Sequence, residues 1–404
     1  MTKPLRVVLI VGNFPGDGKP LLPLADRLDL IVYGTGRRQP WLTYTPEPPA
    51  GCRTRSFEPI LSTTRSGHLL WLYRGLWRAL DADQPDVVHV VSEPWGMLSV
   101  QAAMWARRNP NAALVLHGCD RIWWHGSPAE RLARRLLAQY ALSRADGYAA
   151  ESAKAVQLAV QGGLARGTPT SVIHTNPRDP DVFRPARASE RLACRRQLGL
   201  PDRGLGIGFL GVFVPEKGPF VFFDALRQID RALLESSWVA VAGAGPMERE
   251  VAARAAEERA FFLGCLSYPH QVADFYRSID VFVLPSFRTA DKEEQGPRAI
   301  IEAMLSSCVV VGTNCGAIPE MVDGVGIVVR QKDPSDLARG IVKGIASATS
   351  TSERREARHK AIAVYSGEAV AGQLVELWHG SRVRASAGRS AAAARSLAVE
   401  TPEC

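Results

Sequence analysis

Residues 86–118 read DVVHVVSEPWGMLSVQAAMWARRNPNAALVLHG, and this stretch decides the fold. Its first part, DVVHVVS at 86–92, and its last part, AALVLHG at 112–118, are short apolar runs that end in turn residues. Such runs are typical of strands buried inside a parallel sheet. Between them, MLSVQAAMWARRN at 97–109 has the apolar spacing of a helix, so the stretch predicts a strand, a helix and a second strand parallel to the first.

The same alternation recurs along the chain in two groups. Strands are predicted at 6–12, 28–34, 86–92, 112–118, 145–151 and 170–176 in the first group, and at 204–213, 238–245, 259–266, 280–286, 308–314 and 324–330 in the second. Parallel strands joined by helices give a sheet covered on both faces. We therefore expect an α/β protein with two doubly wound, Rossmann-like domains that face a central cleft, where such sheets bind ligands.

The domain boundaries are expected near breaks in composition. The Pro-rich, charged segment NPRDPDVFRPARASE at 176–190 predicts a linker, which places an N-terminal domain at 1–184 and a C-terminal domain at 185–364. An amphipathic helix at 365–384 is expected to pack back on the first domain. The remainder, 385–404, is rich in Ala, Ser and Arg and predicts a disordered tail.

Bulk composition narrows the class of protein. A chain of 404 residues is too long for one ordinary core, which also favours two domains. The seven cysteines are scattered and form no C-x-x-C pair, which argues against a disulfide framework or a zinc ribbon and suits a reducing cytosol. No stretch reaches about 18 uncharged apolar residues, so we expect a soluble, cytoplasmic protein. The formal net charge of +8 is compatible with anionic substrates, lipid headgroups, nucleic acid or a solvated Arg-rich face, and no nucleic-acid module signature is present.

Two Gly-rich turns resemble nucleotide-binding loops without matching them. GNFPGDGKP at 12–20 has one residue too many between Gly12 and Gly18 for a P-loop, and Pro20 stands where a Ser or Thr would hold magnesium. In AVAGAGPMERE at 240–250, Glu248 replaces the third glycine of a dinucleotide fingerprint. Both turns still offer main-chain N–H groups to an anion, which makes Gly16 a candidate phosphate contact.

EEQGPRAIIEAM at 293–304 carries two acids eight positions apart, Glu294 and Glu302. Proline fits best in the first turn of a helix, so a helix is predicted to begin near Pro297. Glu294 would then lie in the preceding loop and Glu302 inside the helix. The pair could hold one ligand at two points, or the acids could be ordinary helix residues that complement the macrodipole.

Several motifs of the second group occur in a set order. They are GFLGVFVPEKG at 208–218, AVAGAGP at 240–246, FLGCLSYPHQVADFYRSIDVFVLPS at 262–286, EEQGPRAIIEAM, and GTNCGAIPEMV at 312–322. This set resembles the nucleotide-sugar domain of retaining glycosyltransferases of GT-B fold, family 4. The first group is similar to the same family through LHGCD at 116–120 and IHTNPRDPDVFRP at 173–185.

The resemblance implies roles for the acids and for one lysine. Glu302 would bind the ribose hydroxyls of the donor, and Glu294 would lie against the donor sugar and the reaction centre. Lys217, in the E-K-G turn, would bind the diphosphate and stabilise the charge of the leaving nucleotide. By the same resemblance, these three residues together would bind one nucleotide-sugar.

Further donor contacts are implied by the same resemblance. His117 would lie near the donor sugar, and Leu266 would line the base pocket through its main chain. Gly296 and Arg298 would face the phosphates, where the helix start after Pro297 adds positive potential. No metal ion or cofactor is implied.

Two departures from the family keep other functions open. Val212 stands where the family often has an arginine, and Pro297 replaces a glycine of the common loop. The main expectation is a metal-independent retaining glycosyltransferase, an enzyme that moves a hexose-type sugar from a nucleotide donor to a hydroxyl acceptor. A nucleotide-sugar epimerase of GT-B fold and a non-catalytic GT-B-fold partner protein are the alternatives.

The acceptor and the location of the protein are less constrained by the sequence. Trp123 and Trp124 could stack on an acceptor or pack under loops of the first domain. The excess of arginine over lysine indicates a GC-rich coding sequence. Such a source favours an acceptor from secondary metabolism, such as antibiotic biosynthesis, or from the cell envelope. ERLARRLLAQY at 130–140 predicts an amphipathic helix that either covers a soluble domain or contacts the inner face of a membrane peripherally.

Overall fold

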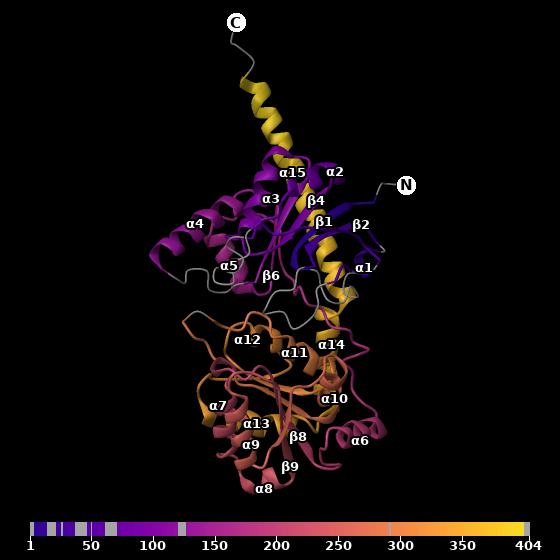
Figure 1. Ribbon diagram of the computed structural model, residues 1–404, viewed down its shortest axis with the longest axis vertical. Coiled ribbons are helices and arrows are strands. Elements are labelled where there is room, and N and C mark those ends of the chain that lie inside the picture. Colours follow the sequence, from indigo (N-terminus) through magenta and orange to yellow (C-terminus); the bar gives the residue numbers. More distant parts are fainter. Residues whose placement is uncertain are drawn as a thin grey trace. The chain divides into compact units, whose positions relative to one another are not determined.

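The computed structural model describes residues 4–13, 22–25, 27–36, 47–49, 51–60, 71–119, 127–290 and 292–399. The chain forms two compact units (Figure 1), one made of Met1–Thr175 with Val370–Cys404 and the other of Asn176–Ala369. Each unit is built on one parallel sheet, so the predicted α/β fold with two Rossmann-like halves is confirmed.

The sheet of the first unit has the strand order β3-β2-β1-β4-β5-β6-β7. Its strands are β1 (Arg6–Asn13), β2 (Asp29–Thr35), β3 (Arg53–Ser56), β4 (Val87–Val91), β5 (Ala113–Gly118), β6 (Gly147–Ala150) and β7 (Thr170–Val172). Its helices are α1 (Leu22–Ala25), α2 (Leu76–Asp83), α3 (Met97–Arg108), α4 (Pro128–Leu142), α5 (Ala153–Gln161) and most of α15 (Gly367–Val399).

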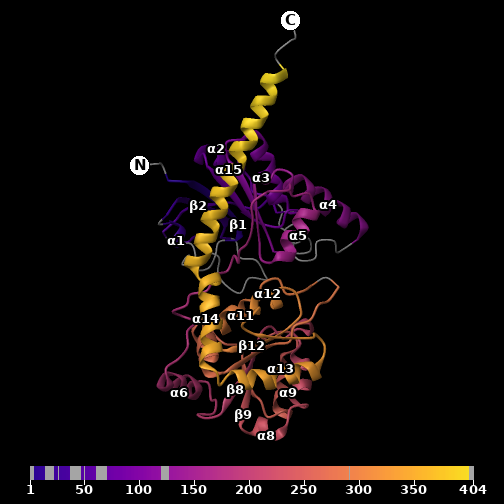
Figure 2. The same ribbon diagram turned by 180° about the vertical axis from the view of Figure 1, so that it is seen from behind.

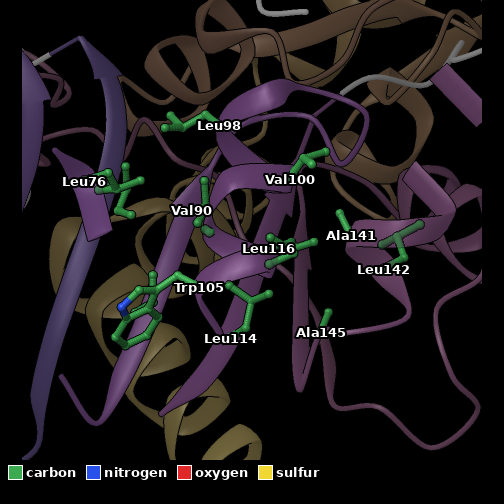
Figure 3. Close-up of a cluster of buried hydrophobic side chains, with 14 of the residues drawn as sticks. Leu76, Val90, Leu98, Val100, Trp105, Leu114, Leu116, Ala141, Leu142 and Ala145 are labelled. Carbon is green, nitrogen blue, oxygen red and sulfur yellow. The ribbon is translucent and has the colours of Figure 1, made fainter. Parts of the chain in front are cut away.

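Successive strand residues point to opposite faces of this sheet, and each face has its own core. On one face Val90, Leu114 and Leu116 pack with side chains of α2, α3, α4 and α5 (Figure 3). On the other face Val87 and Val115 pack with α1 and with the part of α15 that follows Val370, which crosses the first unit in Figure 2. The sheet is therefore covered on both sides, as its apolar strands require.

The sheet of the second unit has the strand order β10-β9-β8-β11-β12-β13. Its strands are β8 (Leu205–Leu210), β9 (Ser237–Ala242), β10 (Phe261–Gly264), β11 (Val281–Leu284), β12 (Val309–Thr313) and β13 (Ile327–Val329). Its helices are α6 (Ala188–Gln197), the short η3 (Pro215–Lys217), α7 (Pro219–Leu226), α8 (Arg231–Glu235), α9 (Glu248–Glu257), α10 (His270–Ser278), α11 (Arg298–Leu305), α12 (Ile318–Val322), α13 (Pro334–Ser347) and α14 (Thr351–Tyr365).

The second sheet is also covered on both faces. Phe209, Val241 and Val283 pack with α7, α9 and α13 on one face. Phe282 and Val310 pack with α10, α11, α12 and α14 on the other. This second core holds α11, the helix that carries Glu302, against the sheet.

The structure differs from the sequence-based boundaries at two places. The second unit begins at Asn176 and not at 185, because Arg178 and Phe183 are buried within it. The helix after Tyr365 begins at Gly367 and continues to Val399, where the composition from 385 onward predicted a disordered tail. Ala, the strongest helix former, is the commonest residue of 385–399, which explains why a helix can extend there.

Candidate functional site

The strand order of the second sheet reverses between β8 and β11. Counting along the chain, β8 leads outward to β9 and β10 on one side, whereas β11 leads to β12 and β13 on the other. The connections leaving the carboxyl ends of such a pair of strands diverge and leave room for a ligand. The loops that follow β8, β11 and β12 carry the candidate residues.

Lys217 and Glu294 meet at this edge. Lys217 ends η3, after β8, and its Nζ lies 2.6 Å from Oε1 of Glu294, in the loop after β11. Ser286 Oγ donates a second hydrogen bond of 2.6 Å to the same carboxylate oxygen. The Glu294 side chain is mostly buried, whereas 29% of the Lys217 side chain is exposed, so the lysine is the more accessible partner of the pair.

The main chain around this pair is fixed by close packing. Gly218 has φ 69°, and a side chain there would collide with the carbonyl oxygen of Pro285. Gly316, after β12, has φ 60°, and a side chain there would collide with the main chain of Glu294. The N–H of Ala317 donates to the carbonyl oxygen of Glu294 at 2.9 Å. Three loops are thus held together at positions that favour glycine, and Glu294 lies among them.

Glu302 lies one and a half turns into α11 and is 5% exposed. Its Oε1 accepts a hydrogen bond of 2.9 Å from Nε of Arg178, and its Oε2 lies 3.4 Å from the hydroxyl of Tyr276. Burial raises the pKa of Glu302, and the charge and hydrogen bond of Arg178 oppose that rise. The acid predicted to bind ribose is therefore a buried carboxylate with its own cation.

The helix that carries Glu302 begins as the sequence predicts. Pro297 is the N-cap of α11, and Arg298, exposed, is the first helical residue. The positive charge of Arg298 lowers the pKa of Glu302, after the larger effects of burial and Arg178. Gly296 lies half-buried in the loop just before the cap. Arg298 and Gly296 therefore flank the chain between Glu294 and Glu302.

Leu266 follows β10, which is an edge strand of the same sheet. It is half-buried and packs against the core that contains α10 and α11. Tyr268, two residues later, has its ring 5.9 Å from the guanidinium carbon of Arg178. The segment predicted to line a base pocket is thus connected through Arg178 to Glu302.

His117 belongs to the first unit, where it ends up among other buried polar groups. It lies on β5 and is 3% exposed, its Nε2 is 3.0 Å from the carbonyl oxygen of Ile173, and its ring stacks on His89 at 5.4 Å. Burial lowers the pKa of His117 and holds that of His89 well below its usual value. Trp378 of α15 donates a hydrogen bond of 3.1 Å to Nδ1 of His89. Within the first unit, His117 is therefore a neutral, enclosed histidine.

Beside this pair, Oε2 of Glu151 lies 2.8 Å from Nδ1 of His174, and Oε1 of Glu151 accepts a hydrogen bond from the main-chain N–H of Thr175. Burial raises the pKa of Glu151, but His174, His117 and Thr175 together lower it by more, so the pKa of Glu151 is lowered overall. The first unit thus has a polar cluster at the carboxyl edge of its sheet, after β5, β6 and β7.

Three predicted contacts lie outside the described residues, namely Gly16, Trp123 and Trp124. Within the described part of the chain, no group of three or more His, Cys, Asp or Glu side chains could hold a metal ion. In the same part of the chain, no helix is long and apolar enough to cross a membrane.

Sequence reasoning missed the partners of the acids. Ser286, Arg178 and Tyr276 come from three different segments and contact Glu294 or Glu302 only after folding. Arg178 lies within the motif at 173–185, and Tyr276 and Ser286 lie within the motif at 262–286. No spacing rule connects residues as far apart in the sequence as 178 and 302. The glycine at 316 is the local sequence signal for the close approach between the loop after β12 and the main chain of Glu294.

Two family models match this chain. The one described as Glycosyl transferases group 1 matches residues 204–347, and the one described as Glycosyltransferase Family 4 matches residues 25–176. The first match falls in the second unit and spans its whole sheet, and the second falls almost entirely in the first unit and spans β2 to β7 of its sheet.

Curated relatives give a consistent picture. Two proteins named D-inositol 3-phosphate glycosyltransferase, from Corynebacterium jeikeium (strain K411) and Stackebrandtia nassauensis, are 29% and 26% identical over 292 and 320 residues. The alignments span 69% and 72% of this chain, and 61% and 68% of the relatives. The chain therefore matches less than two thirds of the length of the first of them.

Solved structures share the fold at lower identity. Anabaena HepE in complex with UDP has a TM-score of 0.67 at 18% identity, covering 92% of this chain and 99% of that one. Sucrose-phosphate synthase from Thermosynechococcus elongatus has a TM-score of 0.65 at 18% identity, covering 93% and 98%. At this identity the likeness establishes the GT-B fold.

Proposed function

Because the chain belongs to the group 1, family 4 glycosyltransferases, we propose that it transfers a sugar from a nucleoside diphosphate sugar to a hydroxyl group of an acceptor, with retention of configuration. The observation that carries the proposal is the meeting of Lys217, Glu294 and Ser286 at the strand-order reversal of the second sheet. A cation beside an oriented carboxylate suits a site where a diphosphate leaves a sugar.

The residues of the second unit have distinct roles in this proposal. Lys217 contacts the diphosphate and stabilises the negative charge that develops on it, since an ammonium group has three N–H donors and Glu294 engages only one of them. Glu294 accepts hydrogen bonds from hydroxyls of the donor sugar. Glu302 accepts hydrogen bonds from the ribose, remote from the breaking bond.

The proposed reaction exchanges one C–O bond for another. The bond between the anomeric carbon and the diphosphate oxygen breaks, and the acceptor oxygen bonds to the same face of that carbon. The acceptor proton leaves with the nucleoside diphosphate. No metal ion is invoked, because Lys217 and the N-terminus of α11 supply the positive potential in this scheme.

The proposal is tested first by binding. Thermal unfolding of the purified protein is followed with UDP, GDP, dTDP and ADP added one at a time. A ligand that binds the folded state and not the unfolded state raises the midpoint of unfolding. We expect one nucleotide to raise it clearly above the others. If none of them does, the proposal loses its basis.

The second test is turnover. The nucleotide that binds is supplied as its sugar conjugates together with an array of hydroxyl acceptors, including inositol phosphates, cell-envelope lipids and secondary-metabolite aglycones, and products are identified by mass spectrometry. We expect a glycosylated acceptor, and no product with Glu294→Ala. Conversion of the donor sugar without any acceptor would identify an epimerase. Binding that survives in Glu294→Ala without turnover in either protein would identify a non-catalytic partner protein.

The acceptor side of the proposal includes a peripheral contact with anionic lipid through α4. Leu132 and Leu136 are each 58% exposed on this helix, one turn apart, and Arg131 and Arg135 are exposed beside them. An apolar stripe flanked by cations is suited to the surface of an anionic bilayer. Sedimentation with phosphatidylglycerol vesicles should retain the protein, whereas Leu132→Gln with Leu136→Gln should release it. Equal binding of both proteins would exclude α4 as the contact.

A further inference from the structure

Arg178 lies directly beside Glu302 and is fixed from several directions. Its main-chain N–H donates to the carbonyl oxygen of Tyr365 at 2.9 Å, at the end of α14. Its Nη1 donates to the carbonyl oxygens of Asn176 and Pro177 at 3.2 and 3.0 Å. Its Nε donates to Oε1 of Glu302 at 2.9 Å. Arg178 is 8% exposed, and its guanidinium group is held in one orientation by its own segment and by Glu302.

The other groups that face Glu302 are weaker partners. On α10, the hydroxyl of Tyr276 lies 3.4 Å from Oε2, which is at the long end of hydrogen-bond distances. Arg298, on α11 itself, acts through its charge. Cys308, after α11, donates to the carbonyl oxygen of Tyr276. On α14, Arg358 donates to main-chain carbonyl oxygens.

We infer that Arg178 is a positioning residue for donor binding, which keeps the Glu302 carboxylate in its acceptor form and oriented toward the ribose hydroxyls of the nucleotide. This inference rests on the proposed function, in which Glu302 accepts those hydroxyls. A carboxylate offers only acceptor sites, whereas a carboxylic acid carries a donor and loses part of that capacity. Arg178 uses one acceptor site on Oε1 and the Tyr276 hydroxyl lies at one on Oε2, which leaves one site on each oxygen for a ligand.

Burial makes this role necessary. In an apolar environment a carboxyl group gains a proton unless a cation opposes the change, and buried glutamates without such a partner have pKa values of about 8 to 9. Burial already raises the pKa of Glu302 in the presence of Arg178. Without the cation the pKa of Glu302 would rise further, so the protonated form would gain population at neutral pH and the carboxylate would return as the pH rises.

The predicted consequence is a binding defect that depends on pH. Loss of the Arg178 charge raises the pKa of Glu302 further, so a smaller fraction of Glu302 is ionised at neutral pH than in the wild type. Nucleotide affinity of Arg178→Met should therefore fall by about tenfold to a hundredfold at about pH 7 and return to within about threefold of the wild type at about pH 9. Arg178→Lys, which restores a cation, should stay close to the wild type at both pH values.

The experiment measures the dissociation constants of UDP, GDP, dTDP and ADP by calorimetry at about pH 7 and about pH 9. The proteins are the wild type, Arg178→Met, Arg178→Lys and Glu302→Gln, each checked for folding by circular dichroism. Glu302→Gln has no titrating group and should bind weakly at both pH values. If Arg178→Met does not fold, Arg178→Gln takes its place, because it keeps an N–H donor without the charge.

The outcomes separate this inference from the proposed function. If the wild type binds none of the four nucleotides, the proposed function fails. If the wild type binds one of them and the neutral Arg178 variant binds it equally well at both pH values, or equally poorly at both, Arg178 has only a structural role. Alkaline recovery in that variant alone supports the inference.

Discussion

Replacing Lys217 by Met tests the proposed site most directly. Methionine has a similar length and no charge, so the substitution removes the ammonium group that lies 2.6 Å from Glu294 and keeps the apolar stem. Ser286 still donates to the same carboxylate oxygen at 2.6 Å, so Glu294 is not left without a partner. With Lys217 partly exposed, we expect the free energy of unfolding to fall by only about 1 kcal/mol.

The expected loss of activity is much larger. Removing one group that stabilises developing negative charge lowers kcat by about 10²- to 10³-fold, or about 2.7–4 kcal/mol of transition-state stabilisation. The charge on the diphosphate grows as the bond to the sugar breaks, so the effect should fall mainly on kcat and less on the KM of the donor. Steady-state kinetics with the donor found in the turnover screen measures both constants, and urea unfolding measures stability.

Lys292 provides a matched control. It is also paired with a glutamate, its Nζ lying 2.9 Å from Oε1 of Glu216, but 63% of its side chain is exposed. Lys292→Met should leave kcat within about threefold of the wild type, because exposed pairs contribute little. If Lys217→Met retained full kcat, or if both variants lost activity equally, Lys217 would not be the residue that stabilises the leaving group.

Three other changes have defined outcomes. Glu302→Gln should raise the donor KM by about tenfold to a hundredfold with a smaller change in kcat, and an unchanged KM would exclude ribose binding. The same variant should lower the free energy of unfolding by about 3 kcal/mol, because Arg178 loses its buried partner. Trp378→Phe removes the donor to His89 and should cost about 1–3 kcal/mol in urea unfolding while nucleotide affinity is unchanged, and a loss of affinity would contradict a purely structural role for this bond. Burial lowers the pKa of His89 and His117, so the unfolded chain binds more protons than the folded chain below about pH 6.5. The free energy of unfolding should therefore fall on acidification by up to about 1.4 kcal/mol per pH unit for each histidine. Urea midpoints that do not change between about pH 7.5 and 5.5 would refute this prediction.

The prediction for Glu302 changes once its surroundings are known. From the sequence alone, an unchanged nucleotide affinity together with a loss of stability in Glu302→Gln would mark the residue as a structural helix acid. Its buried bond to Arg178 means that the variant is destabilised whether or not the residue binds ribose. Donor KM therefore decides the role of Glu302, and stability does not.

The fold was predictable because most of its strands are apolar runs, as expected for strands that are buried on both faces of a parallel sheet. Runs such as DVVHVVS and CVVVGTN are buried on both faces, and the structure places them in β4 and β12. The edge strand β3, Arg53–Ser56, was missed because its four residues are polar and exposed, and its pairing with β2 is made by the main chain. Apolar periodicity does not detect such a strand.

The site was predictable only in part. The loop and helix around Glu294 and Glu302 follow from Pro297, which caps α11 as expected. The contact between Lys217 and Glu294 joins the loops after two strands, and the sequence did not predict it, because the resemblance implies only a separate ligand role for each residue. Arg178 lay in a segment that was interpreted as a linker, because its Pro-rich, charged composition hides the fact that its arginine is buried against α11.

The last helix determines when the first unit can be complete. Trp378 and its neighbours on α15 cover a sheet face that includes Val7, Val87 and Val115, and all of them are buried. During synthesis the whole of the second unit, Asn176–Ala369, leaves the ribosome before that helix does. The half of the molecule that is made first is therefore completed only after the second unit, and its open apolar face must be protected until α15 has been made, the interval in which such surfaces aggregate.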